Sequence, residues 1–156
     1  CEWRPDKMKL AADIPDNELC KACRLLQEYK RMDAKSTRQR AAFLKGKTIS
    51  HPEFNQKISI TGKGIKEWTN QPFEHFYEKN RLLLDIENAF KETSYLGAIP
   101  YHKSDDVKWS HIFEIEIQGS KAWIIVREYT WGDITLHSIS DSLGEYLKEH
   151  KPIKKE

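Results

Sequence analysis

The sequence is poor in cysteine, has no long apolar run and carries almost no net charge. Its three cysteines, Cys1, Cys20 and Cys23, all lie near the N-terminus, and this odd, one-sided set excludes a disulfide framework over the chain. No apolar run approaches the roughly 20 residues of a membrane-spanning helix, so we expect no membrane partner. The net charge of +2 balances 26 basic against 24 acidic residues, which leaves only a local basic surface for nucleic acid.

The chain of 156 residues is long enough for one domain with a hydrophobic core, alone or with a helical extension. The few cysteines suit a reducing compartment better than a small secreted scaffold. The opening CEWRP has neither an initiator Met nor the apolar stretch of a signal peptide. We therefore expect that the sequence continues a longer protein upstream.

The N-terminal cysteines raise the question of a zinc site. Cys20 and Cys23 form a C-x-x-C pair, Cys1 offers a third thiolate, and His51 is the nearest histidine. This spacing matches no zinc module that we can defend, and Cys23 falls on the apolar stripe of a predicted helix. We therefore favour buried or semi-buried thiols, and we expect neither a metal site nor a cofactor.

The N-terminal third of the chain has a helical pattern. Apolar residues recur at helical spacing over residues 17–32, which predicts one amphipathic helix. Ser36 followed by Gln39 matches a capping box and predicts a second, short, basic helix. We therefore expect a helical N-terminal extension over residues 1–47.

The next segment changes from turn residues to helices. Gly, Pro and polar residues over 46–56 indicate a linker. A brief alternating strand is predicted at 57–61, and a short helix should follow it and stop before Pro72. Apolar residues spaced by three, four and seven then predict one long helix over 73–92, laid on a sheet.

The C-terminal half alternates with the period of β-strands. Residues 109–117 and 122–129 alternate around a short connection, which is typical of a hairpin, and 134–140 and 95–99 are further strand candidates. The fold class we expect is therefore α+β, with helices packed on a small antiparallel sheet in one domain over residues 57–142.

The chain should end, over residues 143–156, in a helical turn and a frayed basic tail.

The hairpin register predicts two faces. If the connection is tight, Ile117 lies opposite Ala122. The buried face would then hold Phe113, Ile115, Ile124 and Val126, and the exposed face Glu114, Glu116, Trp123 and Arg127. The last strand would add either His137 or Ser138 to the exposed face, depending on the register of its turn.

Three segments carry a family resemblance: KGIKEWTNQPFEHFYEKNRLLLDIENAF, SHIFEIEIQGSKAWIIVRE and HSISDS. Together with the order of helices before a hairpin-rich sheet, they resemble the phage-associated branch of the barnase, EndoU, colicin and RelE-like nuclease superfamily. Such domains are commonly found at the C-terminus of phage minor head proteins of the Mu F type. The opening CEWRP looks like the end of the Cys-rich segment of the head domain in those proteins. The resemblance covers about residues 57 to 142.

The resemblance implies a barnase-like fold and a toxin-like, metal-independent ribonuclease that works in the phage virion or the host bacterial cytoplasm. Its implied partners are RNA and an immunity protein or components of the phage head and portal. Two alternatives stay open: a non-catalytic structural or interaction domain of the phage head with the same fold, and a module that only binds RNA.

Metal-free cleavage of RNA needs a base for the 2′-OH, an acid for the leaving 5′-oxygen, and cations for the phosphate. His75 lies in the best-matching stretch and is our first acid or base, with one residue of the exposed sheet face as its partner, although a partly exposed helix histidine is about as common. His111 begins a hairpin strand on the face of Phe113, so a place at the edge of the core is slightly favoured over a place in a cleft.

Arg127 on the exposed face is well suited to fork two hydrogen bonds to a phosphate. Glu114 should lie diagonally from Arg127 and is a candidate for the substrate site, as a carboxylate that orients the arginine. On an arbitrary sheet a plain cross-strand ion pair is the favoured interpretation, and the two are compatible. Of His137 and Ser138, we expect that only one faces the cleft. Ser138 matches the SISD pattern of the family, whereas His137 is the better general acid.

Three further residues are candidates for contacts to substrate. Lys79 follows His75 by four residues, which puts both on one helix face and suggests a phosphate contact. Trp123 and Trp131 are candidates for stacking on bases, although packing in the core or at a turn is the more common role of such residues.

Overall fold

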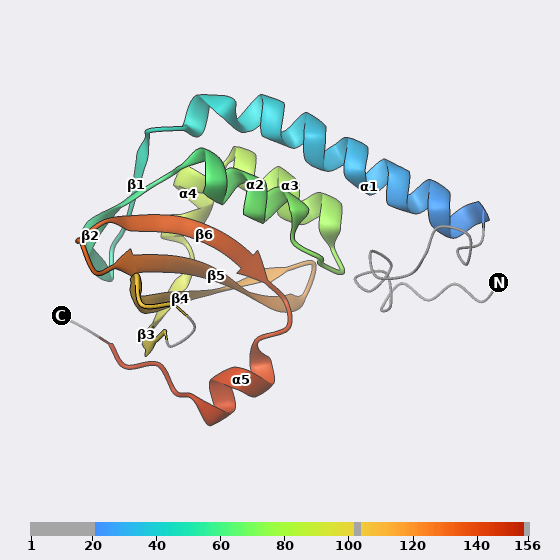
Figure 1. Ribbon diagram of the computed structural model, residues 1–156. Helices are drawn as coiled ribbons and strands as arrows, with labels where there is room; N and C mark the ends of the chain where they lie inside the picture. Colours follow the sequence, from blue (N-terminus) through green and yellow to red (C-terminus); the bar gives the residue numbers. More distant parts are fainter. Residues whose placement is uncertain (1–20, 102–103, 155–156) are drawn as a thin grey trace.

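The computed structural model describes residues 21–101 and 104–154, and it confirms the α+β class. A layer of helices covers one side of a curled sheet, and a last short helix lies on the other side (Figure 1). We call these two sides the helix-side face and the outer face. The division matters because the exposed face predicted from the sequence is the outer face.

Helix α1 spans Lys21–Arg40 without a break and continues into a 3-10 turn, Ala41–Leu44. The prediction of two helices meeting at Ser36 was therefore wrong. Ala34 and Thr37 are buried on the side of α1 that packs against α2 and α3, whereas Ser36 is exposed. Because buried residues precede and follow Ser36 in the sequence, the helix stays continuous: packing outweighs a local capping preference.

Strands β1, Thr48–His51, and β2, Phe54–Ser59, occupy most of the segment predicted as a linker. They form an antiparallel hairpin whose turn contains Pro52. Ile49, Phe54 and Ile58 are buried in the main core. The turn residues were identified correctly, but they connect two strands of the sheet and do not separate domains.

Three helices follow. Helix α2, Gly62–Asn70, confirms the predicted short helix, and the hydroxyl of Thr61 caps it by accepting from the Gly64 amide at 3.1 Å. The single helix predicted over 73–92 is instead two, α3, Phe76–Leu84, and α4, Ile86–Lys91, because the backbone of Asp85 leaves helical geometry at φ −120°, ψ 31°.

The sheet is mixed, not purely antiparallel. Its later strands are β3, Ser94–Pro100, β4, Val107–Ile117, β5, Ser120–Tyr129, and β6, Ile134–Ser140. The strand order is β1-β2-β6-β5-β4-β3, in which β2 and β6 pair in parallel and the other neighbours are antiparallel. The first hairpin therefore joins the sheet through β6.

The β4–β5 hairpin is tighter than predicted. Ile117 pairs with Ser120 across Gln118 and Gly119, which both have positive φ, as a type I′ turn requires. The register thus differs by two residues from the expected pairing of Ile117 with Ala122. A shift of two leaves each side chain on its face, so Phe113, Ile124 and Val126 are buried as predicted.

A β-bulge interrupts the pairing of β5 with β6. Ile125 pairs with Ser138, but the next residue, Val126, pairs with Leu136, so His137 is an extra residue in β6. Strict alternation would place His137 and Ser138 on opposite faces. The bulge removes that constraint at the point where the sequence left the choice open.

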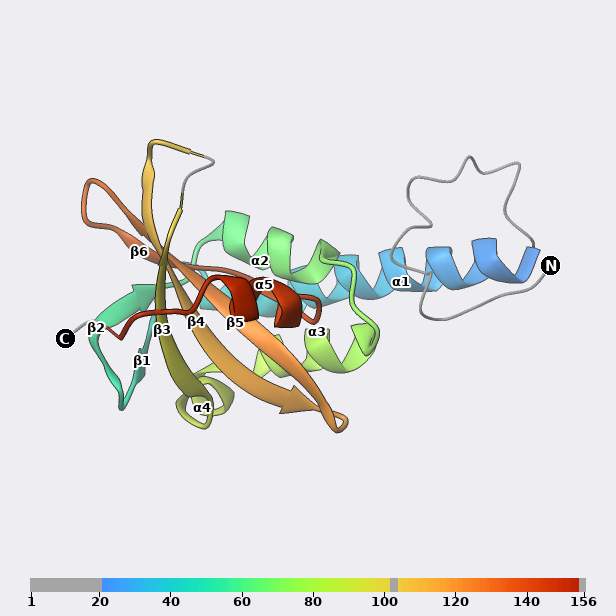
Figure 2. The ribbon, with the colours of Figure 1, turned by 90° about the horizontal axis from the view of Figure 1, so that it is seen from below.

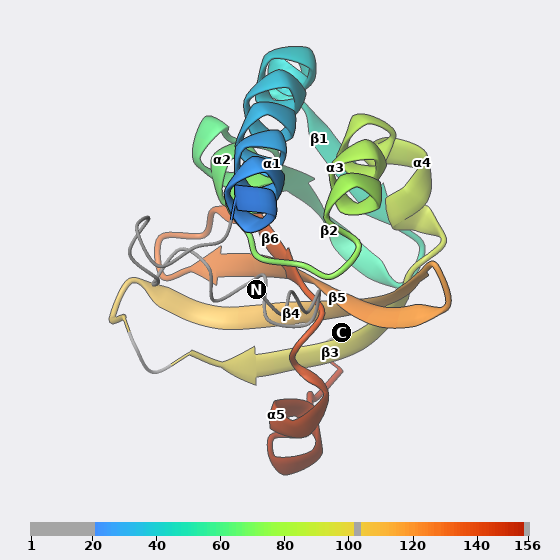
Figure 3. The same ribbon diagram turned by 90° about the vertical axis from the view of Figure 1, so that its right-hand side faces the viewer.

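The C-terminal segment is ordered against the sheet. Helix α5, Gly144–Glu149, confirms the predicted helical turn and lies on the outer face, opposite the other helices (Figure 3). Leu143 and Leu147 pack there on a second apolar cluster of Ile99, Ile112 and Trp123. Seen from that side, the segment crosses in front of the sheet (Figure 2).

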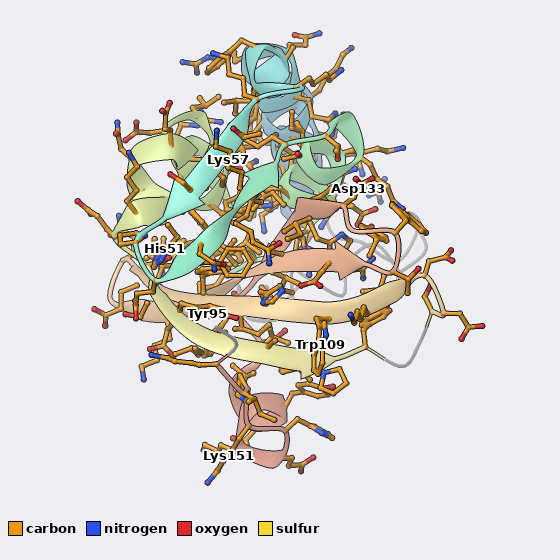
Figure 4. All side chains as sticks on the ribbon, turned by 90° about the vertical axis from the view of Figure 1, so that its left-hand side faces the viewer. His51, Lys57, Tyr95, Trp109, Asp133 and Lys151 are labelled. Atoms are coloured by element: carbon orange, nitrogen blue, oxygen red, sulfur yellow. The ribbon has the colours of Figure 1, made fainter. Side chains whose placement is uncertain are left out.

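The predicted frayed tail was wrong for its first residues. Ile153 forms an antiparallel bridge with Ala98 of β3, and the two backbone hydrogen bonds have N···O distances of 2.8 and 2.9 Å. Gly97, at φ +124°, makes room for it, since a Cβ there would stand 2.6 Å from the carbonyl carbon of Ile153. Figure 4 shows Lys151 of this segment below the sheet, next to α5 and on the side opposite the other helices.

Candidate functional site

A cavity of about 460 Å³ lies on the outer face between the sheet and the C-terminal segment. Its apolar lining comes mainly from Ile99, Ile112 and Ile125 of the sheet and Leu143 and Leu147 of the C-terminal segment. Its polar lining includes Tyr101, Ser110, Arg127, His137, Ser138 and Ser140. The size lies within the range of small-ligand sites, and the mixed lining is typical of them.

Arg127 is the one permanently charged side chain among the described residues that line the cavity, and none of those residues is Asp or Glu. Its Nη2 donates to the hydroxyl of Tyr101 at 3.3 Å, and its guanidinium carbon lies 4.8 Å from the centre of the Tyr101 ring. Its Nε is buried and has no hydrogen-bond partner within the described part of the chain. An arginine with a spare buried donor, in a cavity whose described lining holds no carboxylate, favours an anion.

His137 and Ser138 both line the cavity, so the expectation that only one of them faces it was wrong. The physical reason is the bulge at His137, which turns two successive side chains towards the same side. Ser138 pairs with Ile125 on the neighbouring strand, two residues from Arg127. The structure therefore brings three of the predicted residues, Arg127, His137 and Ser138, to one cavity.

The cavity keeps His137 neutral at pH 7. Burial, followed by the positive charges of Arg127 and Lys63, lowers the pKa of His137 from 6.5 to about 4. A neutral imidazole can accept a proton from a substrate hydroxyl. An anion bound between these cations would oppose their effect and raise the pKa of His137 again.

His75 does not line the cavity. It is half-buried at the residue before α3, where its carbonyl accepts the first hydrogen bond of that helix from the Lys79 amide at 3.0 Å. The adjacent loop is tied to the end of β6, since the Glu74 amide donates to Asp141 Oδ2 at 2.8 Å. The expected convergence of His75 with Arg127 is thus not present in the cavity.

His111 belongs to the core of the helix-side face, as the favoured interpretation predicted, with 1% of its surface exposed. Its Nε2 is 2.9 Å from Glu128 Oε1, and its Nδ1 is 2.8 Å from the hydroxyl of Tyr95. An ionised Glu128 only accepts, so Nε2–H donates to it, and with a neutral imidazole the Tyr95 hydroxyl donates to Nδ1. The imidazole is used by the fold and does not reach the cavity.

Lys79 is not a phosphate contact in this structure, because it is fully buried. Its Nζ donates to the carbonyls of Trp68 at 2.7 Å, Thr69 at 3.3 Å and Gln71 at 2.8 Å, just where α2 ends. Burial lowers the pKa of Lys79 to about 7. The ammonium group satisfies helix-end carbonyls that would otherwise lack donors.

Glu114 does not lie diagonally from Arg127, since Arg127 pairs with Ser110 and Glu114 pairs with Trp123. The Trp123 indole N–H donates to Glu114 Oε2 at 3.1 Å. Trp123 itself is buried in the second apolar cluster and does not line the cavity. Glu114 and Trp123 thus form a cross-strand pair, and Trp123 packs beneath the α5 segment.

The remaining candidates lie away from the cavity. Trp131 is 60% exposed at the β5–β6 turn, stacked on Tyr129 with ring centres 4.9 Å apart. His51 is buried and held by its neighbours, because its Nδ1 accepts from the Glu53 amide and its Nε2 donates to the Thr93 carbonyl at 2.8 Å. Figure 4 shows His51 at the end of the first hairpin, beside the strand that carries Tyr95.

Cys23 is buried, while Cys1 and Cys20 lie outside the described residues.

Comparison with known proteins gives one result. The model of the family described as large polyvalent protein-associated domain 3 matches residues 28–136, more than half of the chain. The chain belongs to this family. It is thus a phage-associated domain, which confirms the phage association that the resemblance implied. The family description names no nuclease. No curated protein and no solved structure matches the chain.

In this large polyvalent protein-associated domain the family match begins within α1 and ends at Leu136, one residue before the bulge. The match therefore runs across the predicted boundary between the helical extension and the sheet domain. None of the helices in the described part of the chain is long and apolar enough to cross a membrane.

Sequence reasoning missed several residues of the cavity. Ser110 shares the face of Glu114 by alternation, and Ser140 shares the face of Ser138. The alternation along the strands could therefore have placed both serines on the outer face. Tyr101 and Tyr146 line the cavity from a loop and from α5. Their placement depends on how those segments fold back on the sheet, which no local pattern reports.

Proposed function

We propose that this domain binds RNA in the outer-face cavity and cleaves it, without a metal ion, by attack of the 2′-OH on the adjacent phosphorus. The observation that carries the proposal is the position of Arg127, an arginine with a spare buried donor in a cavity whose described lining holds no carboxylate. Such a group favours a phosphate, and His137 beside it offers a neutral base.

The cavity supplies a group for each step of this reaction. Arg127 and the Ser138 hydroxyl hold the non-bridging oxygens of the phosphate. His137 takes the proton of the 2′-OH, while the Tyr101 hydroxyl, which already accepts a hydrogen bond from Arg127, gives a proton to the leaving 5′-oxygen. The products are a 2′,3′-cyclic phosphate and a free 5′-OH, and solvent restores both protonation states.

Binding of the substrate also prepares the base. In the empty cavity the pKa of His137, at about 4, makes it a weak base. A phosphodiester placed between His137 and Arg127 shields the imidazole from the positive charge and so raises its pKa. The proton from the 2′-OH is therefore accepted most readily when the phosphate is in place.

The test is to incubate the purified chain with tRNA and with mRNA in the presence of a chelator. We expect wild-type protein to produce fragments that end in a cyclic phosphate, and Arg127→Gln and His137→Gln to reduce the rate on the order of 100-fold or more. His75→Gln is the matched control and should cleave as the wild type does. Intact RNA after incubation with wild-type protein would reject the proposal.

A module that binds RNA without cleaving it is the second candidate. The observation that favours it is that the described lining of the cavity holds one imidazole, while His75, the partner expected from the sequence, lies elsewhere. This candidate predicts RNA affinity that falls with added salt and depends on Arg127, with no product formed.

A further inference from the structure

The cavity has a polar part and an apolar part at different positions along the sheet. Cross-strand pairing puts Ile99, Ser110 and Arg127 in one row, and Ile112, Ile125 and Ser138 in the next. The following row contains Trp123, and a Cβ on Gly144 at the start of α5 would stand 3.6 Å from its ring. The cavity therefore extends from the guanidinium of Arg127 towards α5.

Helix α5 forms the wall at the far end. Leu143 and Leu147 hold the segment on the sheet, and Tyr146 also lines the cavity. Tyr146 is 46% exposed, and α5 contains no buried residue. Its ring stacks on His150, with centres 4.3 Å apart and planes inclined by 28°. Tyr146 is thus a supported aromatic ring that the core does not use.

We propose that Tyr146 is the residue on which a base of the bound RNA stacks, so that the cavity takes one nucleotide with its phosphate at Arg127 and its base at α5. This inference rests on the proposed function, because Arg127 has to place the phosphate first. A volume of about 460 Å³ has room for both parts of a nucleotide. Stacking on an aromatic ring is how single-stranded nucleic acids are commonly held.

The two tryptophans predicted for stacking fit this task less well. Trp123 is covered by α5 and donates its N–H to Glu114. Trp131 is exposed, but it lies at the β5–β6 turn and is not part of the cavity lining. Tyr146 combines exposure with a place in the cavity.

The inference is tested by isothermal titration calorimetry with two probes, adenosine 3′-monophosphate and inorganic phosphate. Tyr146→Ala should weaken binding of the nucleotide about tenfold and leave binding of phosphate unchanged. Tyr146→Phe, which keeps the ring, should bind the nucleotide as the wild type does. Tyr77→Ala, an exposed tyrosine of α3, is the matched control, and circular dichroism verifies the fold of each variant.

The outcomes separate this inference from the proposed function. If Tyr146→Ala binds the nucleotide as tightly as the wild type, or weakens both probes equally, the stacking role is wrong. The phosphate site then stands, provided that Arg127→Gln weakens both probes. If the wild type binds neither probe, the phosphate site fails, and the stacking role fails with it.

Discussion

On the helix-side face of the sheet, His111 donates to Glu128 and accepts from Tyr95, and it is almost fully buried. On the outer face, His137 and Arg127 border a cavity, and one buried donor of Arg127 lacks a partner within the described residues. Both faces thus contain the residue types that suggest catalysis in a sequence. They differ in what the surrounding protein already provides.

This difference teaches how to separate folding residues from candidate site residues. Lys79, His111 and His51 have their hydrogen-bonding capacity taken up by backbone carbonyls and side chains of the core. Because burying an unpaired polar group costs free energy, such groups are conspicuous in a folded protein and need an explanation. Arg127 is such a group, and a ligand is the explanation we propose.

The largest expected effect is a loss of stability on the helix-side face. Lys79→Met removes the donor to three carbonyls at the end of α2, so we expect the free energy of unfolding to fall by about 3 kcal/mol. Urea denaturation measures it. Lys66→Met on the exposed side of α2 should change stability by less than about 0.5 kcal/mol, and an equal loss in both variants would contradict the capping role.

A pair of equivalent substitutions compares the two faces directly. His111→Leu removes the hydrogen bonds to Tyr95 and Glu128 and should lower the free energy of unfolding by about 2 kcal/mol. His137→Leu should change stability at pH 7 by less than about 0.5 kcal/mol, yet stop RNA cleavage. A large loss of stability from His137→Leu would mean that both histidines serve the fold.

The third prediction concerns pH. The pKa of His137 in the folded protein, about 4, lies below the 6.5 of the unfolded chain, so the unfolded chain binds more protons between these values. Stability should therefore fall as the pH is lowered from 6.5 to 4. His137→Gln should reduce this loss by roughly 1–2 kcal/mol, allowing for the partial exposure of the ring. Identical pH profiles of both proteins would show that the imidazole is not desolvated.

The smallest effect tests how the C-terminal segment closes the outer face. Gly97 and Gly132 both have positive φ, but only at Gly97 would a Cβ meet the backbone of Ile153. Gly97→Ala should therefore cost about 1 kcal/mol more than Gly132→Ala, and it should also increase quenching of Trp123 fluorescence by iodide. Equal costs and unchanged quenching would indicate that the segment is not held at β3.

The strand faces were predictable because their period is two. A register error of two residues left Phe113, Ile124 and Val126 in the core and Arg127 on the outer face. The helix breaks were less predictable. The continuous α1 and the interruption at Asp85 depend on which residues pack against other elements, and local periodicity does not contain that information.

The candidate site was predictable only in part. Arg127, His137 and Ser138, all candidates from the sequence, line one cavity, but the bulge that turns both His137 and Ser138 to it left no mark in the sequence. Lys79 was misjudged because a lysine at helical spacing is usually solvated, whereas here the end of α2 comes close enough to use its three protons.

By itself, the sequence determined the α+β class, the buried and exposed faces of the β4–β5 hairpin, and the family of the chain. The tertiary structure decided which polar residues meet. It paired β2 with β6, bulged β6 at His137 and folded α5 over the outer face. These arrangements depend on contacts between residues distant in the chain, and such contacts alone decide whether a histidine or lysine is satisfied by the fold or left to bind a ligand.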